Sequence, residues 1–306
     1  MKNITYDQLV GALYGVALGD ALGMPYEFAY GRKPYVDAIV ANSGQIVGQV
    51  SDDTEMSLAL LHSIKENNGW NRENVIDAYG QWADSDTPDI GRTIGALFCG
   101  YGSVEKKRKS YEATYNLMYV GSPIQSWSQS NGCLMRCVPL LLCPRNEQRW
   151  LDDCQLTNPH PICMEACTLY FKMLYEIIDG TYAPLTIAWS QTPQIRECIE
   201  DALSVKSLLE PGRRNVSKMR GWALHGLYFA MVMYYAKPQT FEDAMRFVIG
   251  CHLDSDTDTN ACIAGGLLGC MLGHAKMLES QQTKENLALL LSAKSNRPYA
   301  YHPCSI

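Results

Sequence analysis

Apolar residues recur at helical spacing over most of this chain, and this periodicity most strongly limits the folds open to it. Between residues 6 and 22, Leu9, Leu13 and Val16 fall on one face behind Thr5, a residue type that often caps a helix. The same spacing predicts helices over residues 55–65, 72–82, 133–142, 162–178, 195–209, 219–235, 241–249 and 260–277. Extended segments are expected only at residues 38–40 and 45–50. The sequence therefore predicts an all-α fold.

Glycines mark one face of the first predicted helix. Gly11, Gly15 and Gly19 recur every four residues. Each glycine costs about 1 kcal/mol of helix propensity relative to alanine. A face that retains them is expected to pack closely against another backbone, at the centre of the protein.

Composition and charge exclude several classes of protein. The chain has 306 residues, of which 47% are hydrophobic, and this excludes wholesale disorder. A net charge of -6 offers no basic surface to a nucleic-acid backbone. We find no apolar run of the roughly 20 residues that span a bilayer, and no secretory signal, so a cytoplasmic location is expected. Without linkers or repeats, residues 1–306 are expected to form a single compact domain and a monomer.

The twelve cysteines are expected to be reduced and mostly buried, because free cysteine behaves as a small apolar residue. Cys133 and Cys137, like Cys163 and Cys167, are four residues apart, which differs from the CxxC spacing of zinc knuckles. Residues 99–125 are the most polar and loop-like part of the chain. Their basic run at residues 106–109 is expected to form a solvated face.

Carboxylates gather at two predicted helix starts, residues 51–55 and 254–259. In the first, Asp52 and Glu55 fit a capping box. The second holds Asp254, Asp256 and Asp258, which repel one another unless a cation or hydrogen-bond donors lie between them.

Two known motifs were tested against the second segment. An EF-hand would need glycine at position 259 and glutamate at position 265, where this chain has Thr259 and Gly265. The DxDxT pattern of haloacid-dehalogenase-type phosphotransferases matches residues 256–259, but the strand that should precede it is missing. Two acidic helix starts that converge on Mg²⁺ or Mn²⁺ remain the better interpretation, with Glu27 as a further acid.

Taken together, the motifs resemble the ADP-ribosylglycohydrolase family, which includes the dinitrogenase reductase-activating glycohydrolase and the ADP-ribosylarginine and ADP-ribosylserine hydrolases. The resemblance is ordered along nearly the whole chain. It rests on residues 19–23 with Glu27, 51–56, 131–140, 160–161 with Ala166, and 256–267.

This resemblance implies a compact helical fold with a two-metal cleft, and it implies a role for individual residues. The implied ligands of two divalent cations, Mg²⁺ or Mn²⁺, are Ser51, Asp52, Asp53, Asp256, Asp258 and Thr259. Glu27 and Asp256 are the implied catalytic acids or bases, and sequence does not choose between them. Asn131, Gly132 and Cys133 would bind the pyrophosphate through backbone N–H groups, and His160 would lie near the phosphates or the distal ribose.

The implied function is hydrolysis of the bond between ADP-ribose and a modified protein side chain, with arginine favoured and free ADP-ribose as product. Alternatives are ADP-ribosylserine, O-acetyl-ADP-ribose or a modified nucleic-acid end as substrate, or a non-catalytic member that binds ADP-ribose or serves a structural role, like the jellyfish lens crystallins of the family. Every expected ligand position keeps an oxygen atom, which favours catalysis. Asp254-Ser255 stands where the family usually has small residues, and Ser51 replaces a common threonine.

Overall fold

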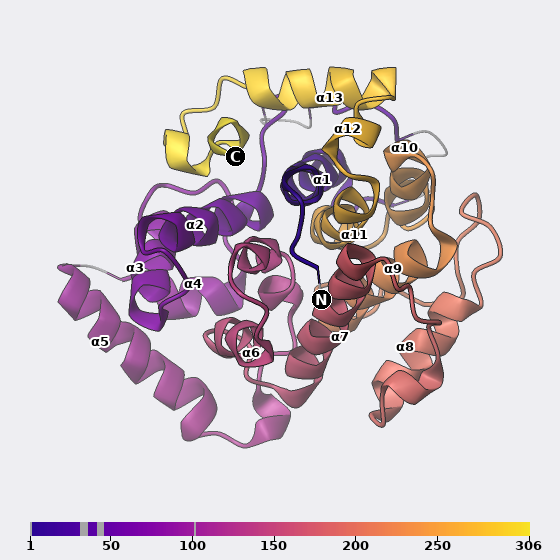
Figure 1. Cartoon of the computed structure of the whole chain (residues 1–306). Coiled ribbons are helices and arrows are strands. Elements are labelled where there is room, and N and C mark those ends of the chain that lie inside the picture. Colours follow the sequence, from indigo (N-terminus) through magenta and orange to yellow (C-terminus); the bar gives the residue numbers. More distant parts are fainter. Residues whose placement is uncertain (1, 31–35, 42–45, 101) are drawn as a thin grey trace.

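The computed structural model describes residues 2–30, 36–41, 46–100 and 102–306. All regular structure in these residues is helical (Figure 1), apart from an isolated bridge between Ser130 and Trp222. The all-α prediction is confirmed. The expected extended segments form no strand at residues 38–40 or 46–50, and Gln45 lies outside the described residues.

The α-helices, in chain order, are α1 (Tyr6–Gly23), α2 (Asp52–Glu66), α3 (Arg72–Ala83), α4 (Arg92–Phe98), α5 (Val104–Tyr115), α6 (Glu147–Gln155), α7 (Pro161–Asp179), α8 (Pro193–Leu203), α9 (Ala223–Ala236), α10 (Phe241–Met245), α11 (Thr257–Leu272), α12 (His274–Met277) and α13 (Gln281–Ser292). Short 3-10 turns are η1 (Met24–Tyr26), η3 (Ile124–Ser126), η4 (Asn131–Cys133), η5 (Val138–Leu142), η6 (Ile187–Trp189), η8 (Tyr299–Tyr301) and η9 (Pro303–Ser305). Two π-helical turns are η2 (Asn116–Val120) and η7 (Arg246–Gly250).

Helices α1 and α11 lie side by side in the interior, with the other helices around them (Figure 1). Their glycines face each other: a Cβ atom on Gly15 would overlap the carbonyl oxygen of Gly265, and one on Gly11 would overlap that of Gly269. The predicted close approach of a second backbone is therefore confirmed. It places the start of α11 beside the end of α1, where the carboxylates gather.

Local signals set several helix ends as expected. Thr5 accepts a hydrogen bond from the backbone N–H of Gln8, whose side chain accepts one from the Thr5 N–H, so α1 begins with a capping box. The predicted box of Asp52 and Glu55 is wrong, because Ser51 occupies the N-cap of α2. A hydroxyl there accepts from the N–H of Asp53 and leaves both acids free for other contacts.

Five predicted helices differ from the structure. The one over 219–235 begins only at Ala223. Residues 133–142 form the turns η4 and η5 instead of an α-helix, since Pro139 cannot donate an interior hydrogen bond. The predicted helix over 195–209 ends at Leu203. That over 241–249 passes from α10 into the π-helical η7. The one over 260–277 is divided by Gly273, whose φ of 76° is left-handed.

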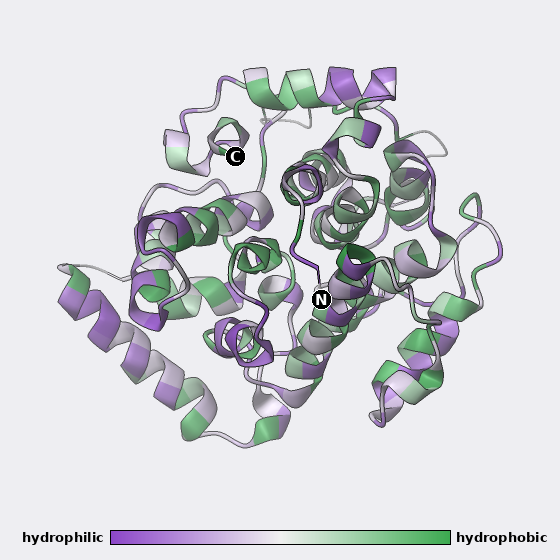
Figure 2. Ribbon diagram, in the orientation of Figure 1, coloured by the Kyte–Doolittle hydropathy of each residue, from purple (hydrophilic) through white to green (hydrophobic). Residues whose placement is uncertain are grey.

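The polar segment 99–125 is largely helical, not a loop. It holds α5 and η2, and Figure 2 shows polar residues along most of α5. Three of the four basic side chains at residues 106–109 form ion pairs: Lys107 with Asp84, Arg108 with Asp77 and Glu73, and Lys109 with Glu105. Ion pairs with neighbouring helices explain why a sequence of this charge forms an outer helix.

One helical segment, Tyr6–Tyr26, is long and apolar enough to cross a membrane by length and composition. This differs from the expectation that no such segment exists. Of its apolar window, 83% is buried inside the fold. Its apolar character therefore fits a helix packed in the protein core.

Candidate active site

The first acidic cluster is built at the start of α2. Ser51 donates a hydrogen bond through Oγ to Oδ2 of Asp53 at 2.8 Å. Asp52 points toward the opposite wall, where its Oδ2 accepts a hydrogen bond from the backbone N–H of Gly91 at 3.1 Å. The N-terminal turn of a helix favours negative charge, so the two acids suit this position.

The second acidic cluster is built at the start of α11. Asp256 lies at the N-cap, and its Oδ2 accepts a hydrogen bond from Nδ2 of Asn131 at 2.7 Å. Oδ1 of Asp258 accepts one from the N–H of Thr259 at 2.9 Å. Thr259 Oγ1 donates to Asp53 Oδ2 at 3.3 Å, so a hydrogen bond joins the starts of α2 and α11.

Asp20 of α1 completes the floor of the site, and sequence reasoning assigned it no role. Its carboxylate accepts hydrogen bonds from the N–H groups of Ser51 and Thr54, at 3.0 and 3.1 Å, and from the Thr54 hydroxyl. It is fully buried. The available signal was a lone acid among the glycine and apolar residues of the first helix, where burial would require a specific partner.

Two sets of carboxylates are close enough to share cations. Asp20, Asp53 and Asp258 each offer an oxygen within 4.8 Å of the others, and so do Glu27, Asp256 and Asp258. Asp258 belongs to both sets and joins them. The structure thus brings together the two acidic segments that the sequence places about 200 residues apart.

Burial and mutual repulsion raise the pKa values of these acids. The pKa of Asp52 rises to about 8, chiefly by burial and then by the charge of Asp89. That of Glu27 rises to about 7, by burial and then by the charge of Asp256. Burial, followed by the charges of Asp20 and Asp52, holds the pKa of Asp53 well above its usual range. At neutral pH the site therefore requires protons or cations to balance its charge.

The donor set fits a hard divalent cation. Oδ1 of Asp53 is buried and has no hydrogen-bond partner among the described residues. Such an orphaned carboxylate oxygen, surrounded by other carboxylates and the hydroxyls of Ser51 and Thr259, matches the oxygen ligands that Mg²⁺ and Mn²⁺ prefer. The residues present can therefore hold such an ion.

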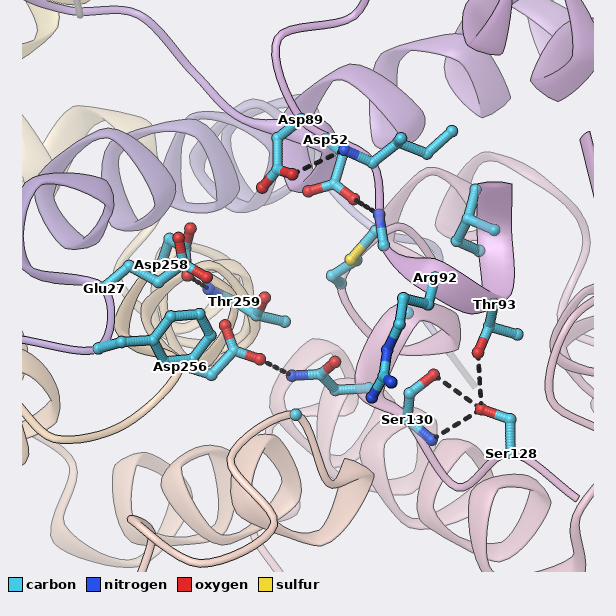
Figure 3. A pocket seen from close by; sticks show the side chains of 18 residues that line it. Glu27, Asp52, Asp89, Arg92, Thr93, Ser128, Ser130, Asp256, Asp258 and Thr259 are labelled. Atoms are coloured by element: carbon cyan, nitrogen blue, oxygen red, sulfur yellow. Dashed lines mark hydrogen bonds between the residues drawn. The ribbon is translucent and has the colours of Figure 1, made fainter. Parts of the chain in front are cut away.

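These clusters open into a cavity of about 460 Å³. Figure 3 shows its polar groups divided between two ends. Glu27, Asp256, Asp258 and Thr259 lie at one end, and Arg92, Thr93, Ser128 and Ser130 at the other, with Asp52 and Asp89 along one side. The cavity thus pairs an acidic end with one that offers a cation and hydroxyl groups.

Not every predicted site residue faces this cavity. Glu27, Asp52, Asn131, Gly132, Asp256, Asp258 and Thr259 line it. Ser51 and Asp53 lie in the floor behind them. The Cys133 side chain is fully buried and outside the lining. His160, also outside it, caps α7 by accepting a hydrogen bond from the N–H of Ile162 at 3.1 Å.

Sequence reasoning missed Asp89 and Arg92 on the opposite wall. Asp89 belongs to the connection between α3 and α4, and Arg92 is the first residue of α4. Each is a charged residue in a polar stretch, a pattern also typical of ordinary surface. Only their position across from Asp52 distinguishes these two residues from ordinary charged surface residues.

Comparison with known proteins agrees with this geometry. The family model described as ADP-ribosylglycohydrolase matches residues 1–293. The chain is 26% identical over 284 residues to the ADP-ribosyl-(dinitrogen reductase) glycohydrolase of Rhodospirillum rubrum, covering 88% of this chain and 86% of that protein. It is 21% identical over 286 residues to the ADP-ribosylarginine hydrolase Tri1 of Pseudomonas putida, covering 89% and 72%.

A solved structure described as an ADP-ribosylglycohydrolase-related protein complex has the same fold, with a TM-score of 0.64 and 22% identity over 98% of both chains. The family match spans nearly the whole sequence and contains both acidic clusters. This chain is therefore a hydrolase of the ADP-ribosylglycohydrolase family.

Proposed function

We propose that this protein is a metal-dependent hydrolase that removes ADP-ribose from arginine side chains of modified proteins. The observation that carries the proposal is the meeting of two acidic helix starts and Glu27 at one end of the cavity. The similarity to an ADP-ribosylarginine hydrolase supports arginine as the acceptor.

Two Mg²⁺ or Mn²⁺ ions would be held by Ser51, Asp52 and Asp53 from one side and by Asp256, Asp258 and Thr259 from the other. The overlap of the two carboxylate sets at Asp258 and the orphaned Oδ1 of Asp53 support this assignment. When bound, the ions balance the buried negative charge and orient the hydroxyls of the distal ribose. Asp20 would position this floor through its hydrogen bonds to the start of α2.

The division of the cavity fits the polarity of ADP-ribose. The acidic end would take the distal ribose, and Arg92 with the hydroxyls of Thr93, Ser128 and Ser130 would face the diphosphate. The backbone N–H of Asn131 donates to the carbonyl oxygen of Gly221 at 2.9 Å, which contradicts its expected role toward the pyrophosphate. The N–H groups of Gly132 and Cys133 are the proposed further contacts to the phosphates. For His160, whose side chain caps α7, substrate contact stays a prediction.

The chemistry is the addition of water to the anomeric carbon with cleavage of its bond to the guanidine nitrogen. Positive charge develops on the ribosyl group as that bond breaks, and the surrounding carboxylates stabilise it. Glu27 and Asp256 are the proposed groups that take a proton from water and return one to the leaving guanidine.

The direct test measures release of ADP-ribose from arginine-modified and serine-modified proteins with Mg²⁺ or Mn²⁺. We expect metal-dependent release from the arginine substrate by the wild type. The double variant Asp256→Asn, Asp258→Asn should fall to background. The control Asp152→Asn, on α6 and remote from the cavity, should keep wild-type activity.

Other outcomes reassign the function. Release from serine alone would change the acceptor, and binding of ADP-ribose and metal without release from either substrate would indicate a binding role or a different leaving group. If neither metal nor ADP-ribose bound, the assignment of the two clusters to a metal centre would be wrong.

A further inference from the structure

A second group of metal-ligating side chains lies behind the wall of the cavity. Cys133 of η4, Cys154 of α6 and Cys167 of α7 place their sulfur atoms within 4.8 Å of one another. Their exposed fractions are 0%, 1% and 1%. Three segments separated by 21 and 13 positions along the chain thus direct thiols to one buried point.

A fourth thiol adjoins this group. Cys163 lies one helical turn before Cys167 on α7, and its thiol shares a neighbour with that of Cys133, which faces the Ser130 carbonyl oxygen at 3.9 Å. The Cys163 thiol faces the backbone oxygens of Ser128 and Ser130 at 3.9 and 3.8 Å. The four thiols therefore form one connected cluster, hereafter the cysteine cluster.

The spacing suits a tetrahedral metal site. A Zn–S bond of about 2.3 Å places the sulfur atoms of a zinc site roughly 3.8 Å apart. The three sulfur atoms of Cys133, Cys154 and Cys167 lie within 4.8 Å of one another, which is compatible with that separation. The fully buried guanidinium of Arg136 favours the thiolates of Cys133 and Cys154, whereas contact with the neighbouring thiols and burial raise the pKa values of Cys154, Cys163 and Cys167.

We infer that Cys133, Cys154 and Cys167 bind a soft divalent cation of the Zn²⁺ class as thiolates, with Cys163 as the fourth ligand. Each ligating thiol passes its proton to solvent as the metal binds, and no electron is transferred. Sulfur ligands select a different class of ion from the carboxylates of the active site. The inference does not depend on the proposed hydrolase activity.

Such an ion would brace the wall of the cavity. Cys133 follows Gly132 directly, and Asn131 of the same turn donates its hydrogen bond to Asp256. The sulfur ligands would fix this turn to α6 and α7. The turn η4 is a single 3-10 turn with few backbone hydrogen bonds of its own. A metal cross-link would therefore stabilise its conformation.

Cobalt provides the test, because Co²⁺ bound by thiolates shows an intense sulfur-to-metal charge-transfer absorption that carboxylate ligands do not give. The full chain is purified under a phosphine reductant, stripped with a chelator and titrated with Co²⁺. We expect the absorption to saturate with one thiolate-bound Co²⁺ per chain. Zn²⁺ should then abolish it by displacement.

Variants locate the site. Cys154→Ala and Cys167→Ala should each lose the absorption, whereas Cys270→Ala, which removes an equally buried thiol from α11, should keep it. With Mg²⁺ in excess to occupy the carboxylates of the active site, Zn²⁺ should raise the melting temperature of the wild type and of Cys270→Ala by more than that of Cys154→Ala. The circular dichroism of each variant checks that it is folded.

Wild-type protein without the absorption would overturn the inference, whatever the variants do. So would an absorption that survives in both Cys154→Ala and Cys167→Ala. Failure of ADP-ribose release with a normal cobalt spectrum would instead count against the proposed function alone.

Discussion

The hydrogen bonds and burial of Asp53 indicate a cation-binding site. Its Oδ2 accepts hydrogen bonds from Ser51 and Thr259, while its Oδ1 is buried without a partner among the described residues. Burial and the charges of Asp20 and Asp52 raise its pKa well above the usual range. An arrangement of this kind costs folding stability and becomes favourable when a cation neutralises it.

Replacing Asp53 with asparagine should therefore stabilise the metal-free protein. The amide keeps the shape, removes one negative charge and supplies a donor to the neighbouring carboxylates, so we expect a gain of about 1 kcal/mol in the free energy of unfolding. Stabilisation by Mg²⁺ or Mn²⁺ should disappear. Denaturant titrations with a chelator and with each metal, beside Asp152→Asn, measure both effects. A loss of metal-free stability in Asp53→Asn would contradict the argument.

His252 should make stability depend on pH. Nδ1 bonds to the Phe247 carbonyl at 2.7 Å, while Nε2 is buried without a partner among the described residues. Burial lowers its pKa to about 4 from the ordinary value of 6.5, so between these values the unfolded chain binds more protons. The stabilisation is complete above pH 6.5 and is lost as pH falls toward 4, by at most about 3 kcal/mol.

The variant His252→Gln isolates this effect, since the other buried acids and histidines titrate equally in both proteins. Between pH 7 and pH 5, the wild type should lose more free energy of unfolding than the variant does. Equal losses in chemical denaturation would show that His252 is not buried as a neutral group.

Among the secondary-structure elements, the contact of α1 with α11 does the most to place the site. Glycines at Gly11, Gly15 and Gly19 allow the backbones to touch, and this brings Asp20 to the start of α11. Gly23 meets the backbone of Asp258 in the same way. Any side chain in this row would separate the helices and, with them, the two acidic clusters.

Gly15→Ala should destabilise the fold strongly. Its Cβ would overlap the carbonyl oxygen of Gly265, which belongs to a rigid helix and cannot move aside, so we expect a loss of about 3 kcal/mol or more. Gly80→Ala, in helix α3, is the matched control. A Cβ atom on Gly80 would have nothing within 4 Å, so we expect the free energy of unfolding to rise by about 0.5–1 kcal/mol. Thermal unfolding of both variants tests the close packing of α1 against α11. Equal effects of the two substitutions would refute this account of the packing.

Across the molecule, the C-terminal segment reaches back to the helix that carries Asp52 and Asp53. Nε and Nη2 of Arg297 donate to Oε1 and Oε2 of Glu55 at 2.6 and 2.8 Å, and Trp82 Nε1 donates to Oε2 at 2.8 Å. Glu55 is completely buried. Two residues 242 positions apart in the chain thus form one ionic contact in the first turn of α2.

Arg297→Met should cost about 3–5 kcal/mol in the free energy of unfolding, because it leaves the buried Glu55 charge without its cation. The double variant Glu55→Gln, Arg297→Met should recover part of this loss. A double-mutant cycle by denaturant titration measures the coupling. Additive losses would show that the two side chains act independently.

Part of the fold and of the active site could be predicted from the sequence. Helical periodicity located α1, α2, α3 and α7 closely, and the acid motifs named most of the residues that line the cavity. These inferences succeed because spacing and capping are local properties of the chain.

Other features depended on packing. The place of α5 on the outside of the fold rests on ion pairs of Lys107 and Arg108 with the end of α3 and with α3 itself. The turns at residues 133–142, by contrast, follow from Pro139, a local signal that apolar periodicity does not register. Asp89 and Arg92 join the cavity only because their connection lies across from Asp52.

The sequence alone determined the helices, the glycine face and the two acidic segments, because each depends only on residue types a few positions apart. Which groups would meet was settled by the fold: Asp20 under Asp53, Asp258 between both carboxylate sets, and Cys133 beside Cys154 and Cys167. Periodicity carries information over a few turns of helix. Contacts between distant segments depend on how whole helices pack, and here the close approach of α1 and α11 decides them.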